Sequence, residues 1–213
     1  MLSGPLLVAY LSFTFVLVIT PGSTTAVVVR NTLAGGRAMG LAAAAGAAVA
    51  NTSHATAAGL GLAVVFARWP LALMALRFAG AAYLGWLGVV SLYRTARFAD
   101  GGLQVLSNGT TEGATAQRRG SFRQGFTVNV LNPAIATFYL VVVPSFLPSG
   151  APRWYFVVLA ALHVTIAFAC HGLWAVGLDR VRRVFRRPES RRLLEGATGV
   201  ALIALAGRVF LAN

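Results

Sequence analysis

Long stretches without a charged residue alternate along this chain with short clusters of arginine. Ala38–Ala67 and Gln124–Pro152 contain no charged side chain, whereas a surface helix of a soluble protein carries polar residues along one face. About 20 mostly apolar residues are enough to span a bilayer as a helix. The pattern therefore predicts an all-α membrane protein. Six segments meet or approach this length: roughly Leu6–Val29, Ala38–Phe66, Pro70–Leu92, Phe126–Leu147, Trp154–Leu178 and Leu193–Leu211.

Proline interrupts the first and the fourth of these six transmembrane segments. The breaks are Thr20-Pro21-Gly22-Ser23 and Asn132-Pro133, and the two prolines lie 112 residues apart, about half the chain. In lipid, the backbone groups that such a break frees must find partners in protein, water or a ligand. Matched interruptions in two halves are typical of a transporter with its solute site near the bilayer midplane.

Three segments in each half place the second half upside down with respect to the first. The sequence therefore predicts a 3+3 inverted repeat of transmembrane helices with broken first and fourth helices. We expect one membrane transporter domain over residues 1–213, with halves of about 1–95 and 122–213. Because the stretch between them is rich in glycine, a flexible inner loop of about 96–121 is predicted.

The arginines indicate on which side of the membrane each predicted loop lies. All 18 basic residues are arginine. If the N-terminus is outside the cytoplasm, the three inner loops hold two, five and seven of them, and only four lie outside. Cytoplasmic loops carry the excess of positive charge, so we expect both termini to be periplasmic.

Composition and charge narrow the function. Of all residues 57% are hydrophobic and 11% are charged, and the formal net charge is +13. Because the arginines sit between the segments and not on one face of a soluble unit, the charge does not predict nucleic-acid binding. The sequence shows no catalytic constellation, metal-ligand cluster or phosphate loop, so we expect neither an enzyme nor a cofactor or metal.

Both breaks offer the chemistry of a carboxylate site. Thr20 and Asn132 are residue types that cap a helix, and each is followed by a proline suited to the first helical position. A half-helix that starts there presents free N–H groups and a partial positive charge to a small anionic or zwitterionic solute. The alternative is that the prolines only kink helices. The candidate solute-binding residues are Thr20, Pro21, Gly22, Ser23, Thr24, Asn51, His54, Asn129, Asn132 and Pro133.

Histidines are the titratable groups within the predicted segments. All five acidic residues lie in predicted loops or at the end of a segment, so His54, His163 and His171 are the candidates for a proton path. His163 and His171 are eight residues apart, on about the same face of a helix. Hydrogen bonding between helices is the alternative role for all three.

Several motifs occur in order between residues 15 and 147. With them the chain resembles the LysE/RhtB family of bacterial amino-acid exporters. The matching motifs are Thr20-Pro21-Gly22, Arg30-Asn31, Gly35-Gly36-Arg37 with Gly40-Leu41, Leu76-Arg77-Phe78-Ala79-Gly80-Ala81-Ala82-Tyr83-Leu84 with Trp86-Leu87-Gly88, Phe122-Arg123-Gln124-Gly125, Asn129-Val130-Leu131-Asn132-Pro133, Pro144 and Phe146.

This resemblance implies a six-span carrier of the bacterial inner membrane that exports amino acids or related metabolites with the proton gradient. Three positions depart from the family pattern. Ser23 stands where the family has a second proline, Asn51 where an acidic residue is common, and Ala134 where lysine often follows Asn-Pro. The departures remove ionisable groups from both halves. The resemblance therefore does not decide whether the protein recognises cationic substrates or couples export to protons.

The leading hypothesis is an exporter of a small, neutral amino acid or derivative, with that solute and membrane lipids as its partners. A channel or passive facilitator for small metabolites is the first alternative, because the predicted spans lack carboxylates. A non-transporting membrane scaffold is the second. Small residues in the second segment favour packing within the bundle, and a homo-oligomer stays open.

Overall fold

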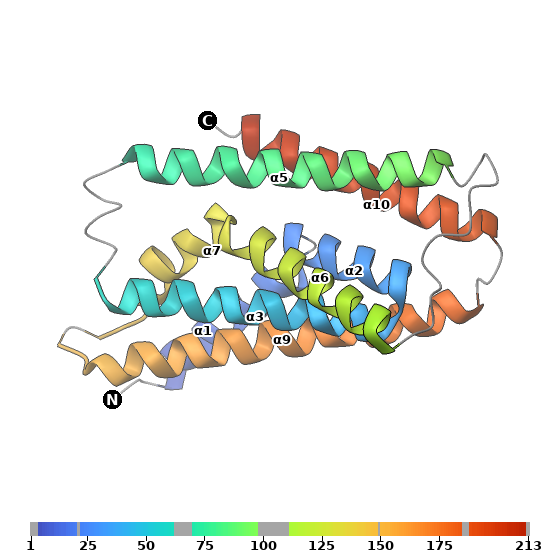
Figure 1. Ribbon diagram of the computed structural model, residues 1–213. Helices are drawn as coiled ribbons and strands as arrows, with labels where there is room; N and C mark the ends of the chain where they lie inside the picture. Colours follow the sequence, from blue (N-terminus) through green and yellow to red (C-terminus); the bar gives the residue numbers. More distant parts are fainter. Residues whose placement is uncertain are drawn as a thin grey trace.

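Helices form the parts of the chain that the computed structural model describes, namely residues 4–20, 22–61, 70–97, 111–148, 150–184 and 188–211, and these parts contain no strand (Figure 1). The helices are α1 (Gly4–Ile19), α2 (Ser23–Gly35), α3 (Arg37–Gly59), α5 (Pro70–Arg97), α6 (Thr111–Val130), α7 (Pro133–Thr137), the π-helical turn η2 (Phe138–Val142), α8 (Val143–Ser145), α9 (Arg153–Val184) and α10 (Pro188–Leu211).

The long helices lie roughly along one direction, and α3 is at the centre of the bundle. It packs against α2, α6 and α9, while α10 lies along α5 (Figure 1). The helix axes bend by 49° between α1 and α2, and by 57° between α6 and the helix that starts at Pro133. Two broken helices were predicted from the prolines, and the structure confirms a bend at each place.

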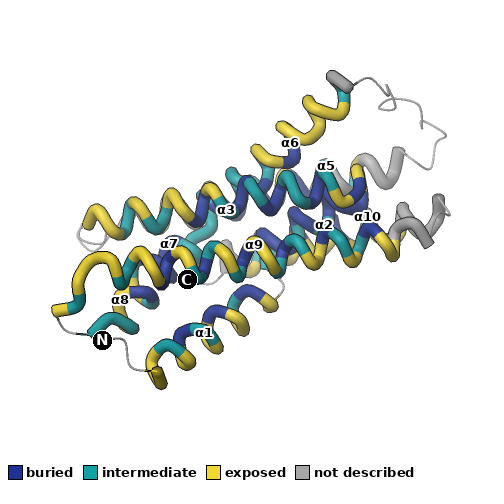
Figure 2. The backbone as a smooth tube through the Cα atoms, turned by 90° about the horizontal axis from the view of Figure 1, so that it is seen from below, coloured by how far each residue is buried: buried dark blue, intermediate teal, exposed yellow. Residues whose placement is uncertain are grey.

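By length and composition, one described helix can cross a membrane on its own, over Arg153–Val181, and each of the two bent pairs could form one further span. The other long helices contain shorter apolar stretches, such as Phe78–Val90 in α5 and Gly196–Arg208 in α10. Exposed residues follow one another along the outside of the bundle (Figure 2). Large apolar residues are among them, for example Val8, Leu173 and Val200. An apolar exterior of this kind suits contact with lipid. Among the described residues, length and composition thus support up to three spans, and six spans stay a prediction.

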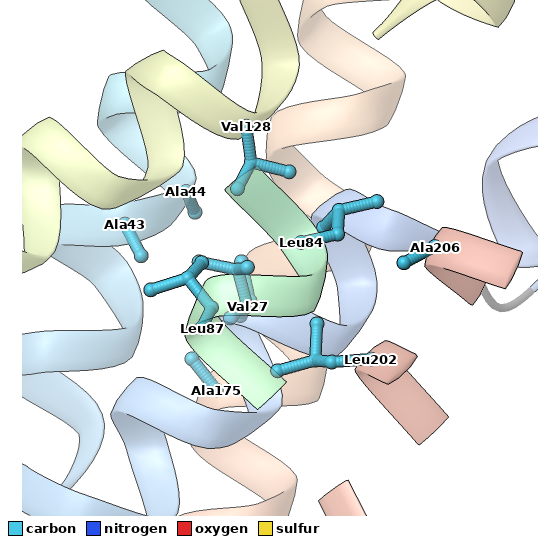
Figure 3. Packing of buried hydrophobic residues seen from close by; sticks show 10 residues of the cluster. Val27, Ala43, Ala44, Leu84, Leu87, Val128, Ala175, Leu202 and Ala206 are labelled. Carbon is cyan, nitrogen blue, oxygen red and sulfur yellow. The ribbon is translucent and has the colours of Figure 1, made fainter. Parts of the chain in front are cut away.

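Two buried clusters hold the bundle together. The larger one lies where α2, α3, α5, α6, α9 and α10 meet (Figure 3), and its members are Val27, Val28, Ala43, Ala44, Leu84, Leu87, Val128, Ala175, Leu202 and Ala206. The second cluster joins α1, η2, α8 and α9 and is rich in aromatic residues: Tyr10, Phe138, Tyr139, Val143, Leu159 and Ala160. The two clusters connect the first half of the chain to the second, so neither half has a separate core.

Two details of the sequence prediction are wrong. Residues 111–121 were assigned to a flexible loop, yet α6 begins at Thr111. The glycines suggested a loop, but this stretch also contains alanine, glutamine and arginine, which favour helices. Residues 98–110 of that prediction lie outside the described residues. Asp179 was placed beyond the end of a span, but α9 continues to Val184 and buries it.

Glycine allows α3 and α6 to approach until their backbones touch. A methyl group at Gly46 would collide with the carbonyl oxygen of Phe122, and one at Gly125 would collide with that of Ala43. Small residues at such positions are the usual basis of close helix packing in membranes. The contact holds the C-terminal half of α6 against the central helix, α3.

We expect Gly125→Ala to destabilise the protein and Gly120→Ala, on the same helix, to leave it unchanged or slightly more stable. A methyl group at Gly120 meets nothing within 4 Å, and alanine favours a helix interior over glycine by roughly 0.5–1 kcal/mol. Overpacking at Gly125 costs about 1–3 kcal/mol, and each kcal/mol lowers the melting temperature by about 2–4 °C in a chain of this size. Thermal unfolding in detergent would measure both, and equal melting temperatures would contradict the close contact.

Candidate functional site

The two breaks meet inside the bundle through side-chain hydrogen bonds. The Thr24 hydroxyl donates to Asn129 Oδ1 at 2.8 Å, and Asn132 Nδ2 donates to the Ser23 hydroxyl at 3.1 Å. Thr24 and Ser23 begin α2, whereas Asn129 ends α6 and Asn132 precedes α7. Residues more than 100 positions apart therefore form one polar cluster.

Asn129 is the centre of this cluster and is 1% exposed. Its Nδ2 donates to the carbonyl oxygen of Ala47 at 2.9 Å and to Asn51 Oδ1 at 2.6 Å. Its backbone carbonyl lies 3.2 Å from His54 Nε2. Both ends of the Asn129 amide are thus satisfied, as a buried polar group requires. We call the group Ser23, Thr24, Asn51, His54, Asn129 and Asn132 the break junction.

The two half-helices at the break junction begin differently. Asn132 caps α7, because its Oδ1 accepts the N–H of Ala134 at 3.0 Å and Pro133 takes the first helical position. This confirms the predicted cap. The cap position of α2 is Gly22, which has no side chain and makes no capping bond. The first turn of α2 therefore presents N–H groups without a side-chain cap, together with the positive end of the helix dipole.

Thr20 lies outside the break junction, contrary to the prediction that it caps the second half-helix. It is exposed, and its hydroxyl donates to the carbonyl of Val16 at 2.7 Å, one turn back in α1. Threonine commonly bonds the carbonyl four residues earlier, and this local bond keeps Thr20 with α1. Pro21 lies outside the described residues. Gly22 and Pro133 are half-buried at the starts of α2 and α7.

The three histidines have separate partners. His54 Nε2 lies 3.2 Å from the Asn129 carbonyl within the break junction, His171 Nε2 lies 3.4 Å from the Thr25 hydroxyl, and His163 Nδ1 lies 2.7 Å from the Tyr139 hydroxyl. The rings of His54 and Tyr139 are stacked with centroids 6.5 Å apart. Because no hydrogen bond found in the described residues joins one histidine to another, a continuous proton path would need water, and that path stays a prediction.

Sequence reasoning missed two polar contacts between helices. One contact lies toward the C-terminal end of α2. There, Gln124 Oε1 accepts hydrogen bonds from Arg30 Nη1 at 2.9 Å and from Asn31 Nδ2 at 3.1 Å. Buried Asp179 accepts the N–H of Arg37, the first residue of α3, at 3.2 Å, where a carboxylate favours the helix start. The arginine that directly follows the first apolar segment, Arg30, was the signal in the sequence that could have revealed the first contact.

The sequence of the chain is similar to those of a known protein family and of several proteins. The model of the LysE type translocator family matches residues 15–213. The chain is 27% identical to the uncharacterized membrane protein YrhP of Bacillus subtilis over 198 residues, which cover 92% of this chain and 94% of that protein. It is 28% identical to a homoserine/homoserine lactone efflux protein of Salmonella typhimurium over 93% of this chain and 92% of that protein.

A leucine efflux protein of Klebsiella pneumoniae is 27% identical over 204 residues, which cover 94% of this chain and 92% of that protein. No solved structure gives a significant match. Because the family model covers nearly the whole sequence, both broken helices included, the chain belongs to the family of LysE type translocators.

Proposed function

We propose that this translocator exports a small, neutral amino acid or derivative across the bacterial inner membrane, and that the break junction binds the solute. Members of the family are membrane transporters and not enzymes. The efflux proteins for homoserine and leucine named above support amino acids as the class of solute. The observation that carries the assignment of the site is the pair of bonds from Ser23 and Thr24 to Asn132 and Asn129.

The open start of α2 suits the carboxylate of the solute. Its first-turn N–H groups lack a side-chain cap, and helix N-termini bind anions with such groups. The α7 start is less available because Asn132 already occupies it. Acceptors for an ammonium group lie close by, at Asn51 Oδ1 and the Asn129 carbonyl. One junction therefore offers partners to both charges of a zwitterion.

The neutral character of the junction supports a neutral solute. Its side chains are hydroxyls, amides and one imidazole, with no carboxylate among them. A second positive charge on the solute would be buried without a counter-charge, which is costly inside a membrane. In this structure the junction's polar groups satisfy one another, so the solute must exchange its hydrogen bonds for theirs. Such an exchange keeps binding weak enough for release.

The helix contacts support the inverted repeat. In an inverted repeat, each helix of the first half has an equivalent helix in the second half. The equivalent helices would be α3 and α9, α5 and α10, α1 and α6, and α2 and the helix after Pro133. Several contacts follow this pairing: α3 packs on α9 and α5 on α10, while the contact of α3 with α6 corresponds to that of α9 with α1. The contact of α2 with α10 corresponds likewise to that of α5 with α7.

The orientation with both termini periplasmic is also part of this proposal. The first helix begins and the last helix ends toward the same end of the bundle, where α9 also begins (Figure 1). The opposite end carries the ends of α5 and α9 and the start of α6, with Arg97, Arg118 and Arg183 in these stretches. Arginine-rich ends face the cytoplasm.

We expect a cysteine at Pro152, beside the start of α9, to react with a membrane-impermeant maleimide in intact cells, and a cysteine at Gly109 to react only after the cells are opened. Both would be placed in a Cys170→Ser background, since Cys170 is the chain's own cysteine. Labelling of the Gly109 variant in intact cells would refute the proposed orientation.

The site predicts that Asn132→Ala and Pro21→Ala abolish export while the protein still inserts. Loss of Asn132 removes the cap of α7 and the bond to Ser23, and loss of Pro21 would favour a continuous helix that closes off the N–H groups needed by the carboxylate. Uptake into inverted vesicles, normalised to protein level, measures the effect. Ser53→Ala is the matched control, because Ser53 is exposed and bonded only to its own helix at Val49. Unchanged transport in both variants would exclude the site.

Asn51→Asp tests the basis of substrate choice. Asn51 accepts from Asn129 through Oδ1, and a carboxylate can accept the same bond, so the fold should be kept. The added negative charge should shift preference toward cationic amino acids or make export more dependent on pH. Competition by lysine against a labelled neutral amino acid would measure the first effect. Thr52→Asp, one position away and exposed, should produce neither.

A channel or passive facilitator remains the second candidate function, since the break junction lacks a carboxylate for coupling. Counterflow separates the two. A carrier exchanges labelled solute faster when unlabelled solute is present on the opposite side, whereas a pore does not. Purified protein in proteoliposomes that shows no counterflow with any amino acid would favour the channel.

A further inference from the structure

The break at Pro133 deprives one backbone carbonyl of its helical donor. In an α-helix the carbonyl of Asn129 would accept the N–H of the residue four positions later, but that residue is Pro133, which has no N–H. The carbonyl instead accepts the N–H of Asn132 at 3.1 Å and lies 3.2 Å from His54 Nε2. A carbonyl oxygen can only accept a hydrogen bond, so His54 is the donor here. His54 of α3 thus replaces a donor that the proline removes.

Both acceptor positions of the Asn129 carbonyl are therefore occupied. A carbonyl oxygen has two lone pairs, and Asn132 and His54 each take one. The same carbonyl is one of the acceptors that the proposed function gives to the ammonium group of the solute. The N–H of Asn132 belongs to the backbone turn between α6 and α7, whereas His54 is a side chain that can turn away. An ammonium group that binds this carbonyl therefore takes the place of His54.

The ring of His54 is in contact with that of Tyr139. The two rings are stacked, with centroids 6.5 Å and planes 15° apart, which is within the range of favourable aromatic pairs. Tyr139 is fully buried and belongs to the π-helical turn η2, which packs against α3. Single π-helical turns occur frequently at functional sites. Tyr139 therefore limits how far the His54 ring can move from the Asn129 carbonyl.

His163 connects Tyr139 to α9. Its Nδ1 lies 2.7 Å from the Tyr139 hydroxyl, and the two rings meet edge to face with centroids 5.2 Å apart. Because a hydroxyl can donate or accept, this bond forms with either tautomer of His163. His163 is also fully buried. A continuous series of contacts thus runs from α9 through Tyr139 to His54 and the Asn129 carbonyl.

We propose that the ammonium group of the solute displaces His54 from the Asn129 carbonyl, and that Tyr139 is the positioning residue that returns His54 to it. This rests on the amino-acid export proposed above. The return of His54 takes an acceptor away from the solute, so a firmly held ring weakens binding and speeds release. A loosely held ring has the opposite effect, since differences in affinity are mostly differences in the rate of dissociation. Tyr139 acts through His54 and needs no contact with the solute.

Tyr139→Phe tests this role, because phenylalanine keeps the ring and removes the bond to His163. We expect both KM and the maximal rate of homoserine or leucine export in proteoliposomes to fall about two- to tenfold, which corresponds to the loss of one neutral hydrogen bond. A change that only damages the fold lowers the maximal rate through the loss of active protein and leaves KM unchanged. A KM equal to that of wild type, or above it, would overturn the proposal.

A double variant with Tyr139→Phe and His163→Leu separates the proposed role from a loss of stability. Tyr139→Phe alone leaves a buried imidazole nitrogen without its partner, which is costly, whereas replacing both partners by apolar groups is nearly neutral. We expect the melting temperature of the double variant to lie closer to that of wild type than the single variant does, while KM and the maximal rate stay low. A KM that recovers together with the melting temperature would show that the bond only supports the fold.

Tyr10→Phe is the matched control. Tyr10 is fully buried in the same aromatic cluster, and its hydroxyl donates to the Leu159 carbonyl of α9 at 2.6 Å. Its ring packs on those of Phe138 and Phe146. The variant removes a buried hydroxyl but keeps the bond between Tyr139 and His163, so it should lower the melting temperature and leave KM unchanged. An equal fall of KM in Tyr10→Phe would assign the effect to the whole cluster and overturn the role of Tyr139.

A ¹⁵N spectrum of His54 tests the positioning without transport. We expect Nε2 to carry a proton, and its signal to move in Tyr139→Phe but not in Tyr10→Phe. An unchanged His54 signal in Tyr139→Phe would count against the proposal as firmly as an unchanged KM. If the wild-type protein exports no amino acid at all, the proposed function fails, and the spectrum still decides whether Tyr139 positions His54.

Discussion

A backbone that leaves the helix inside a bilayer must find its hydrogen bonds elsewhere in the protein, and this constraint governs the centre of the molecule. At the second break, Asn132 Oδ1 accepts the N–H of Ala134, and His54 Nε2 of the first half lies 3.2 Å from the backbone carbonyl of Asn129. The side chains of Asn129 and Asn132 also bond to Thr24, Ala47, Asn51 and Ser23 of the first half, so residues at the break join the two halves. The proposed solute site is thus made of groups that also hold the two halves together.

The sequence was sufficient to predict the breaks, the cap at Asn132 and the meeting of Ser23, Thr24, Asn51, His54 and Asn129, because proline and polar residues stand out in apolar segments. The sequence did not predict the hydrogen-bond partner of Thr20. Whether that hydroxyl turns back to Val16 or forward to α2 depends on the helix phase across the break, which no local pattern records. The start of α6 was missed for a related reason, since composition rich in glycine does not exclude a helix when its neighbours favour one.

The pairing of Tyr139 with His163 was also beyond sequence reasoning. The π-helical turn Phe138–Val142 contains Tyr139, and the extra residue in such a turn rotates every side chain that follows it. Spacing rules for an α-helix therefore fail across this stretch. His163 and His171 do lie on one helix as expected, but their partners, Tyr139 and Thr25, come from opposite halves of the chain. The two histidines consequently occupy different surroundings despite their shared face.

The close approach of α3 to α6 at Gly46 and Gly125 has a counterpart at Gly88 and Gly199, where a methyl group on Gly88 would lie 2.9 Å from the Gly199 carbonyl oxygen. Helices in backbone contact cannot slide past one another without separating. The pairs α3/α6 and α5/α10 are therefore two stiff struts, each built from one helix of either half. An opening of the proposed solute site toward one side of the membrane would then come from tilting one strut against the other, with α2, which packs against α3, α6 and α10, between them.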